Sequence, residues 1–265
     1  MQLTDIFLYP IKSTQAYGVA QAVVQPQGLN FDREFMLTEP NGKFITARKD
    51  GELFNFSAFP IPFGLHIQHK DGSQLVVRYF DFSELENCEV WGTEFASFVA
   101  PLEINQWFSE KIGCDVQLRW TGLETQRRIN RFPESAVSFA DGYPLLLTTQ
   151  ASLQEVQKHC PVSVKMAQFR TNLVVDGETA FDEQQWEKIQ IGDVAFFNAK
   201  PCTRCILTSR DPDTHLLDKT MEPFRTLKKI NVSEKGDPLF GINLIPLNSG
   251  VIKIGDQVEI LSYKA

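Results

Sequence analysis

Short apolar runs separated by polar turns are the feature that most restricts the fold of this chain. The first hundred residues contain two pairs of such runs, 35–37 with 44–46 around Glu39-Pro40-Asn41-Gly42, and 65–68 with 74–79 around Lys70-Asp71-Gly72-Ser73. Gly-containing polar turns between runs of this length are typical of β-hairpins. We therefore expect two hairpins there, followed by a short strand at 90–93.

The remaining sequence predicts more strands and a few helices. Strands are expected at 116–120, 173–175, 189–191, 194–197, 250–256 and 258–261. A helix is expected at 104–112, where apolar residues share one face and Gly113 follows, and another at 153–160, where Ser152 and Glu155 form a capping box. Many short strands with few helices indicate a mainly β fold of the sandwich or barrel kind. The first helix is the expected boundary between a domain of residues 1–100 and one of residues 101–265.

Composition excludes several classes of protein. The chain has 265 residues and a net charge of -7, which disfavours a nucleic-acid-binding protein because such proteins need a basic surface. No stretch reaches the about 18 apolar residues of a membrane helix, and the N-terminus lacks the pattern of a secretory signal. The five cysteines, an odd number, do not make a disulfide framework. We predict a cytoplasmic protein without a membrane span.

The segment of residues 200–214, K-P-C-T-R-C-I-L-T-S-R-D-P-D-T, is the strongest candidate for chemistry. It holds two thiols, Cys202 and Cys205, and Arg204 directly precedes the second. Thiolates bind soft metals, and a neighbouring cation favours the ionised thiol. The segment is therefore a candidate metal or redox site.

Three interpretations of the two thiols follow from the residues alone. A structural zinc site would need a second pair of ligands, but the other cysteines are scattered, and His66 and His69 fall on opposite faces of an expected strand. A thioredoxin-like site would need a helix after Cys205, and Asp211-Pro212 leaves no room for a full one. Two inert cysteines in a barrel loop are the third interpretation.

Seven segments in order along the chain resemble those of MOSC domains (molybdenum cofactor sulfurase C-terminal domains), in the subfamily of bacterial YcbX and the mitochondrial amidoxime-reducing component. They are Tyr9-Pro-Ile-Lys-Ser13, Phe31-Asp-Arg-Glu-Phe35, Phe44-Ile-Thr-Ala-Arg48, Phe139-Ala-Asp-Gly-Tyr-Pro144, Phe169-Arg-Thr-Asn172, the 200–214 segment and Asn248-Ser-Gly-Val-Ile-Lys-Ile-Gly-Asp256. The resemblance implies a β-barrel N-terminal domain followed by a β-barrel MOSC domain. It also implies that the protein binds the molybdenum cofactor, a pterin dithiolene with a terminal phosphate.

The resemblance also assigns site residues. Cys205 would be the molybdenum ligand and a catalytic residue, and Cys202 would be either a neighbour in the outer shell or a small buried apolar residue. Cofactor binding is implied for Lys12, Arg33, Arg170, Asn172, Thr203, Arg204 and Cys205. Asp141 is the second catalytic candidate, as a carboxylate that moves protons, although Asp-Gly is also a common turn pair. Tyr143 departs from the small hydroxyl residue expected there.

The function implied is the reduction of N-hydroxylated compounds such as hydroxylaminopurines, amidoximes and hydroxylamines, including detoxification of N-hydroxylated bases. Some bacterial relatives carry an added C-terminal ferredoxin domain with a C-x4-C-x2-C motif, which this sequence lacks. Either a separate iron–sulfur or flavin reductase supplies the electrons, as we expect, or a ferredoxin domain has been lost or trimmed. A cofactor or sulfur carrier without reductase activity is the alternative, and pyridoxal phosphate binding is a further family-level possibility. Arg127, Arg128 and Arg131 form a basic group, interpreted as a solvated loop rather than as a guide for anionic substrates or a redox partner.

Overall fold

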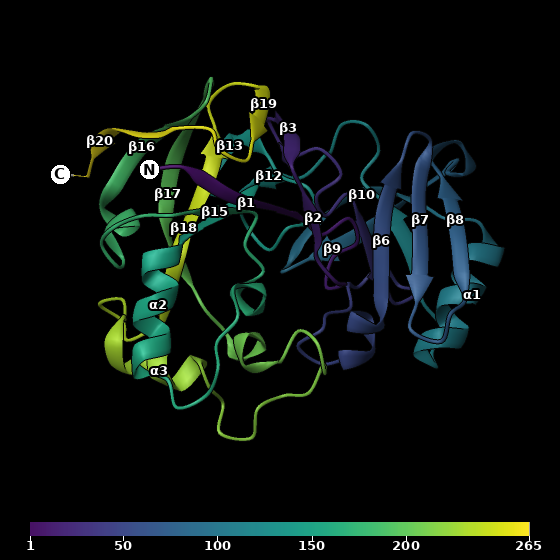
Figure 1. Cartoon of the computed structure of the whole chain (residues 1–265). Helices are drawn as coiled ribbons and strands as arrows, with labels where there is room; N and C mark the ends of the chain where they lie inside the picture. Colours follow the sequence, from purple (N-terminus) through teal and green to yellow (C-terminus); the bar gives the residue numbers. More distant parts are fainter. Residues whose placement is uncertain (265) are drawn as a thin grey trace. The chain divides into compact units, whose positions relative to one another are not determined.

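The structure, a computed structural model that describes residues 1–264, is built mainly from β-strands, with three α-helices in that range (Figure 1). The chain divides into two compact units that are interleaved in sequence. Unit 1 comprises residues 1–7, 18–30 and 143–265, and unit 2 comprises residues 8–17 and 31–142. No helix within residues 1–264 is long and apolar enough to cross a membrane.

An eight-stranded mixed sheet forms the frame of unit 1. Its order is β2-β1-β15-β14-β18-β17-β16-β20, where β14 and β15 are parallel and β1 lies antiparallel to β15. The strand bounds are β1 Leu3–Leu8, β2 Tyr17–Val19, β14 Leu145–Thr149, β15 Leu173–Val175, β16 Trp186–Ile191, β17 Val194–Thr203, β18 Leu239–Pro246 and β20 Val258–Tyr263. A smaller sheet contains β19 (Gly250–Lys253), β3 (Gln21–Gln25) and β4 (Gly28–Leu29).

Two helices of unit 1, α2 (Gln150–His159) and α3 (Phe224–Ile230), lie side by side (Figure 1). They enclose an apolar cluster in which Phe169 stacks on Phe240 with ring centroids 3.8 Å apart. Burial of two such rings fixes the chain just before Arg170. Short 3₁₀ helices complete the unit: η3 Met166–Phe169, η4 Asp182–Gln185 and η5 Ile206–Ser209.

Antiparallel sheets form unit 2. One has the order β5-β11-β10-β9 and another β6-β7-β8, with β12 and β13 as a separate pair. The bounds are β5 Phe35–Thr38, β6 Phe56–Ile61, β7 Gly64–His69, β8 Gln74–Arg78, β9 Glu84–Val90, β10 Thr93–Val99, β11 Gln117–Trp120, β12 Arg128–Ile129, β13 Phe132–Ala136, α1 Leu102–Ile112, η1 Gly51–Asn55 and η2 Tyr79–Asp81. Met36, Phe44, Cys88, Val90 and Phe139 form one of its buried clusters.

Much of the expected β-structure is confirmed. The hairpin expected at 65–79 is present as β7 and β8, and the helix expected at 104–112 is α1, which ends at Gly113 in the left-handed conformation with φ 83°. The turn at 39–42 also forms, but the strand expected at 44–46 is reduced to an isolated bridge between Thr38 and Phe44. The domain boundary expected between residues 100 and 101 stays a prediction.

Two expectations about local structure are wrong. Residues 90–93 are not one strand: Trp91 and Gly92, with φ of 52° and 78°, form the turn between β9 and β10. The second helix begins three residues earlier than expected, because Thr149 rather than Ser152 caps it. The Thr149 hydroxyl accepts from the Ser152 N–H at 3.0 Å, while the Ser152 hydroxyl donates to buried Glu183 at 2.9 Å.

Candidate functional site

The cysteine segment, residues 202–205, lies in unit 1 where β17 ends and η5 begins. Pairing of β17 with β18 holds the strand, and the Arg204 N–H continues that pairing by donating to the Pro238 carbonyl at 2.8 Å. The Cys205 carbonyl then accepts from the backbone N–H and the hydroxyl of Thr208, at 3.1 and 3.0 Å. The backbone on both sides of Cys205 is therefore fixed, and its free thiol is half-buried.

Arg204 is oriented by contacts within the same unit. Its Nη2 donates to the Phe169 carbonyl at 2.7 Å, and its Nη1 donates to Cys202 Sγ at 3.0 Å. The sequence suggested that this cation would favour an ionised thiol at Cys205, but the guanidinium contacts Cys202 instead. A strand residue and its second neighbour point the same way, which places Cys202 and Arg204 together. Cys202 therefore accepts a hydrogen bond from Arg204, a contact that the sequence did not indicate.

The other predicted cofactor residues of unit 1 differ in how exposed their side chains are and in whether the protein already uses their hydrogen-bonding groups. Arg170 follows η3 in the left-handed conformation, with φ 54°, and is half-buried. Thr203 is exposed at the end of β17. Asn172 is 1% exposed, and its amide donates to the Phe7 carbonyl at 3.1 Å and accepts from the Leu146 N–H at 3.2 Å. Its side chain thus joins three segments of unit 1, and its predicted cofactor contact stays a prediction.

The donor set of unit 1 fits an anionic cofactor that takes one protein thiolate. Cys205 supplies the half-buried thiol, and Arg204 supplies a guanidinium whose buried Nε has no hydrogen-bond partner within residues 1–264. A buried N–H without a partner is costly, and an acceptor on a bound group would satisfy it. The residues present therefore fit a group with a soft metal and phosphate or pterin acceptors.

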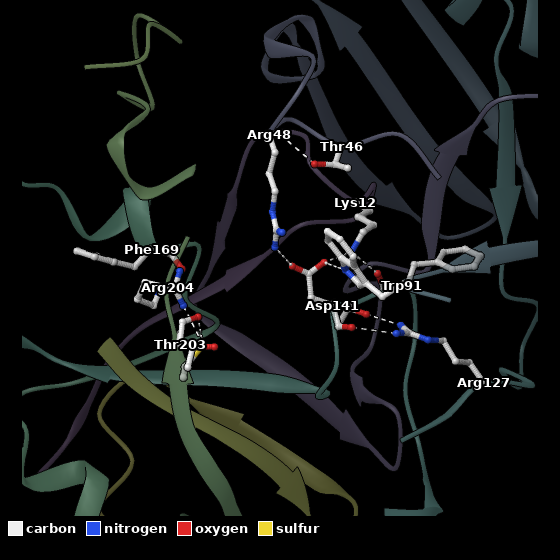
Figure 2. A network of polar contacts seen from close by, with 12 residues as sticks. Lys12, Thr46, Arg48, Trp91, Arg127, Asp141, Phe169, Thr203 and Arg204 are labelled. Atoms are coloured by element: carbon white, nitrogen blue, oxygen red, sulfur yellow. Dashed lines mark hydrogen bonds and ion pairs between the residues drawn. The ribbon is translucent and has the colours of Figure 1, made fainter. Parts of the chain in front are cut away.

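In unit 2, Asp141 is the centre of a charged group that we term the Asp141 cluster: Lys12, Arg48, Trp91, Arg127 and Asp141. Figure 2 shows Lys12, Arg48 and Trp91 converging on the carboxylate, and Arg127 reaching the backbone beside it. Oδ1 accepts from Lys12 Nζ and from Trp91 Nε1, the latter at 3.1 Å, and Oδ2 accepts from Arg48 Nη2 at 3.1 Å. The Asp141 side chain nevertheless keeps 57% of its surface exposed.

Protonation in the cluster follows from burial and charge. Burial lowers the pKa of Lys12 to about 8, against the opposing charge and hydrogen bond of Asp141. For Asp141, the surrounding protein opposes ionisation, but the charge and hydrogen bond of Lys12, with Trp91 and Arg48, hold its pKa well below the usual range. Asp141 is therefore a carboxylate at neutral pH, able to accept a hydrogen bond but not to donate one.

Arg127 fixes the backbone that carries Asp141. Its guanidinium donates to the carbonyls of Ser138 at 2.9 Å, of Ala140, and of Asp141 at 2.9 Å (Figure 2). It is buried, so its interpretation as part of a solvated loop is wrong, whereas Arg128 and Arg131 are exposed. Burial also lowers the pKa of Arg127 to about 10, which leaves it charged at neutral pH.

Arg33 is held by its own neighbours in unit 2. Its Nη1 donates to Asp32 at 2.6 Å, and the guanidinium lies 4.2 Å from the Tyr9 ring centroid. Its backbone has φ 49°, and its carbonyl accepts from the Phe139 N–H at 2.9 Å, which connects Arg33 to the segment before Asp141.

The structure thus brings Lys12 and Asp141 together in unit 2, and Thr203, Arg204 and Cys205 together in unit 1. Sequence reasoning missed Trp91 as a partner of Asp141 and did not weigh Arg48 or Arg127 there. The sequence offered one signal for Trp91, its position directly before Gly92 in a turn. Such a turn requires positive φ, which is rare at a bulky residue and is found most often at functional sites. Tyr143, the departure noted in the sequence, lies under Lys200 at 5.5 Å in unit 1.

Comparison with known proteins adds the family. A model of the MOSC N-terminal beta barrel domain matches residues 1–115, and a model of the MOSC domain matches residues 134–259. The chain is a MOSC-domain protein. The expected family and the mainly β fold are thereby confirmed.

Named relatives refine the family assignment. The chain is 29% identical to "Mitochondrial amidoxime reducing component 2" of Macaca fascicularis, over 97% of this chain and 82% of the relative. It is 26% identical to "Mitochondrial amidoxime-reducing component 1" of Homo sapiens, over 98% of this chain and 82% of the relative. It is also 28% identical to "Molybdenum cofactor sulfurase" of Oryza sativa subsp. japonica, over 92% of this chain but only 32% of that protein.

Proposed function

We propose that this MOSC-domain protein is a molybdenum-cofactor-dependent oxidoreductase that reduces N-hydroxylated compounds. Candidate substrates are hydroxylaminopurines, amidoximes and hydroxylamines, and a separate redox partner would supply the electrons. The observation that carries the proposal is the cysteine segment. Its half-buried Cys205 thiol, at a fixed backbone position, directly follows Arg204, whose buried Nε has no hydrogen-bond partner within residues 1–264. Relatives named for amidoxime reduction, which align over nearly the whole chain, support it.

The residues of unit 1 would divide the binding of the cofactor. Cys205 would hold the metal through Sγ, Arg204 and Arg170 would bind anionic oxygens, and Thr203 would bind polar groups of the pterin. When bound, the cofactor would supply a metal that takes up the oxygen of the N–OH group. The overall change consumes two electrons and two protons and yields the N–H compound and water.

The predicted roles of Lys12, Arg33 and Asp141 remain proposals about unit 2. Lys12 and Arg33 carry the positive charge suited to a phosphate, although both already bind carboxylates, those of Asp141 and Asp32. Asp141, kept ionised by its neighbours, would accept a hydrogen bond from water or substrate and receive a proton only transiently. Cytoplasmic location, base detoxification and pyridoxal phosphate binding stay predictions.

The test is metal content together with turnover. Protein made in a host that synthesises the cofactor should contain molybdenum and should reduce benzamidoxime with a chemically reduced dye as electron donor. With NADH as the only reductant it should be inactive. Cys205→Ala should lose both metal and activity, whereas Cys114→Ala, at an exposed thiol, should lose neither. Wild-type protein without molybdenum, or full activity in Cys205→Ala, would refute the proposal.

A cofactor or sulfur carrier is the second candidate, favoured by the similarity to a protein named molybdenum cofactor sulfurase. A carrier should release its cofactor to an empty acceptor protein during incubation and should not reduce benzamidoxime. A reductase should keep its molybdenum through many turnovers. Measuring molybdenum in both proteins after mixing and separating them decides between the two.

A further inference from the structure

Arg48 has hydrogen-bonding capacity that the protein does not use. Its guanidinium carries five N–H donors. Within residues 1–264 the guanidinium makes one hydrogen bond, from Nη2 to Asp141 Oδ2 at 3.1 Å. The Arg48 side chain is 33% exposed, so the remaining donors can reach a ligand. The planar arrangement of those donors matches two oxygens of a carboxylate or a phosphate.

Two contacts hold the Arg48 guanidinium in one orientation before any ligand arrives. Its carbon lies 4.4 Å from the centroid of the Trp91 ring, and Asp141 fixes Nη2. Trp91 is itself held by its hydrogen bond to Asp141 Oδ1 and by Phe44, whose ring centroid is 4.9 Å away (Figure 2 shows Arg48 and Trp91). A side chain fixed in this way loses little conformational entropy when it binds.

The backbone of Trp91 is strained, and packing in the core does not explain why a Trp occupies this position. Trp91 adopts φ 52° at the turn between β9 and β10, and 46% of its surface is exposed. Left-handed backbone at a bulky residue is unfavourable by about 1–3 kcal/mol, and such strain is concentrated at functional sites. The strain places an indole where it stacks on Arg48 and reaches Asp141.

The local charge favours an anion. Lys12, Arg33, Arg48 and Arg127 are four cations in this part of unit 2, and Asp32 and Asp141 are the carboxylates paired with them. Two positive charges remain within this set, and Glu89, whose carboxylate accepts from the Gly92 N–H beside Trp91, offsets one of them. Lys12 and Arg127 are buried, so solvent screens their charge poorly. A negatively charged group beside Arg48 would gain from that excess although the whole chain carries -7.

We propose that Arg48 is a specificity-determining residue that binds a carboxylate or phosphate group of the substrate, with Trp91 and Asp141 as its positioning residues. The inference rests on the proposed function for the reaction, but the binding itself does not depend on it. N-hydroxylated compounds that carry an oxyanion are therefore preferred over neutral ones of the same shape.

The experiment compares 4-carboxybenzamidoxime with neutral benzamidoxime. Binding of each to the full-length protein is measured by calorimetry, with protein from a cofactor-producing host and from a cofactor-deficient one. Steady-state reduction of each is measured with the cofactor-containing protein. The variants are Arg48→Gln, Trp91→Phe, Trp91→Leu and the matched control Arg78→Gln, which removes an exposed Arg that lies 5.9 Å from the Phe80 ring in the same unit.

Arg48→Gln should weaken binding of the carboxylated compound roughly ten-fold more than binding of the neutral one, the usual effect of losing a charged hydrogen bond. The ratio of kcat/KM for the carboxylated compound to kcat/KM for the neutral one should fall by the same factor. Because each ratio is taken within one variant, a change at Asp141 that affects both compounds cancels. Arg78→Gln should leave both ratios unchanged. Trp91→Leu should reproduce part of the loss, and Trp91→Phe should restore stacking and recover most of it. Equal effects on both compounds, or none, would overturn the inference.

Two further outcomes separate the inference from the proposed function. If neither compound is reduced but Arg48→Gln still weakens binding of the carboxylated one, the inference stands and the proposed function fails. If both are reduced without discrimination, the inference fails alone. Loss of molybdenum and pterin in Arg48→Gln would assign this residue to the phosphate of the cofactor and overturn its role with substrate.

Discussion

The cysteine segment and the Asp141 cluster both contain predicted site residues, but they are constructed differently. The cysteine segment is four consecutive residues, fixed by strand pairing and by backbone hydrogen bonds. In the Asp141 cluster, Lys12, Arg48 and Trp91 come from separate parts of unit 2 and bind one carboxylate, while Arg127 binds the backbone that carries it. A continuous motif can be read from sequence, whereas a cluster assembled over distance becomes visible only in the fold.

The largest effect should come from the cysteine segment. Cys205→Ser should lose molybdenum and reduce activity by more than about 100-fold, because losing an outer-shell partner of a metal already costs 10–100-fold. Cys202→Ser should keep most of the metal. Metal analysis by mass spectrometry on both purified variants checks this, and equal metal loss in the two variants would show that the thiols share the role.

The next largest effect should be on stability through Arg127. Arg127→Met leaves the carbonyls of Ser138, Ala140 and Asp141 without their donor and should lower the free energy of unfolding by about 3 kcal/mol. Urea denaturation measures it. Arg128→Met, at the exposed neighbour, is the control and should change stability by less than about 0.5 kcal/mol. An equally mild effect at both positions contradicts the structural role given to Arg127.

The lowered pKa of Lys12 predicts that the free energy of unfolding depends on pH. Its pKa is about 8 in the folded protein and 10.5 when unperturbed, so between these values the unfolded chain binds more protons. Stability should therefore rise, by about 2 kcal/mol, as pH increases from 8 towards 10.5, relative to a Lys12→Met variant. Lys70→Met, which removes an exposed Lys, is the control. Parallel curves for wild type and Lys12→Met would contradict the prediction.

The smallest effect concerns Cys202. The Arg204 guanidinium donates to Cys202 Sγ, so this sulfur lies beside a fixed positive charge. In cofactor-free protein, Arg204→Gln should slow alkylation of Cys202 by the anion iodoacetate by about five-fold, because the guanidinium attracts a negatively charged reagent. Labelling at exposed Cys114 should not change. Peptide mass spectrometry follows both sites, and an unchanged rate at Cys202 speaks against the contact in solution.

Sequence reasoning succeeded where a signal is local. Gly113 ended the first helix as expected, and the hairpin at 65–79 formed because its turn and alternation agree. Sequence reasoning failed where two residues could play the same role and a distant contact decides between them. Ser152 lost the capping position to Thr149 because buried Glu183, 31 residues away, binds the Ser152 hydroxyl. Arg127 was expected in solvent, and no nearby residue indicates that three carbonyls would hold it inside.

The same limit applies to the candidate site. Lys12, Asp141 and Cys205 could be named because each lies in one of the seven segments that resemble the family. The resemblance did not show that Lys12 and Asp141 form an ion pair, or that Arg204 faces Cys202. Side-chain partners depend on rotamers and burial, which a motif does not encode.

Pairing of the first strand has a consequence for synthesis of the protein. Leu3 in β1 lies opposite Val175 in β15, so the N-terminal strand has no such partner until most of the chain has been made. At about 5–20 residues per second, the intervening stretch of about 170 residues takes roughly 10–30 s to translate. During that time the apolar residues of β1 are without this partner strand. Nascent chains stalled before residue 173 should therefore be bound by chaperones or cleaved near the N-terminus, and longer ones should be protected.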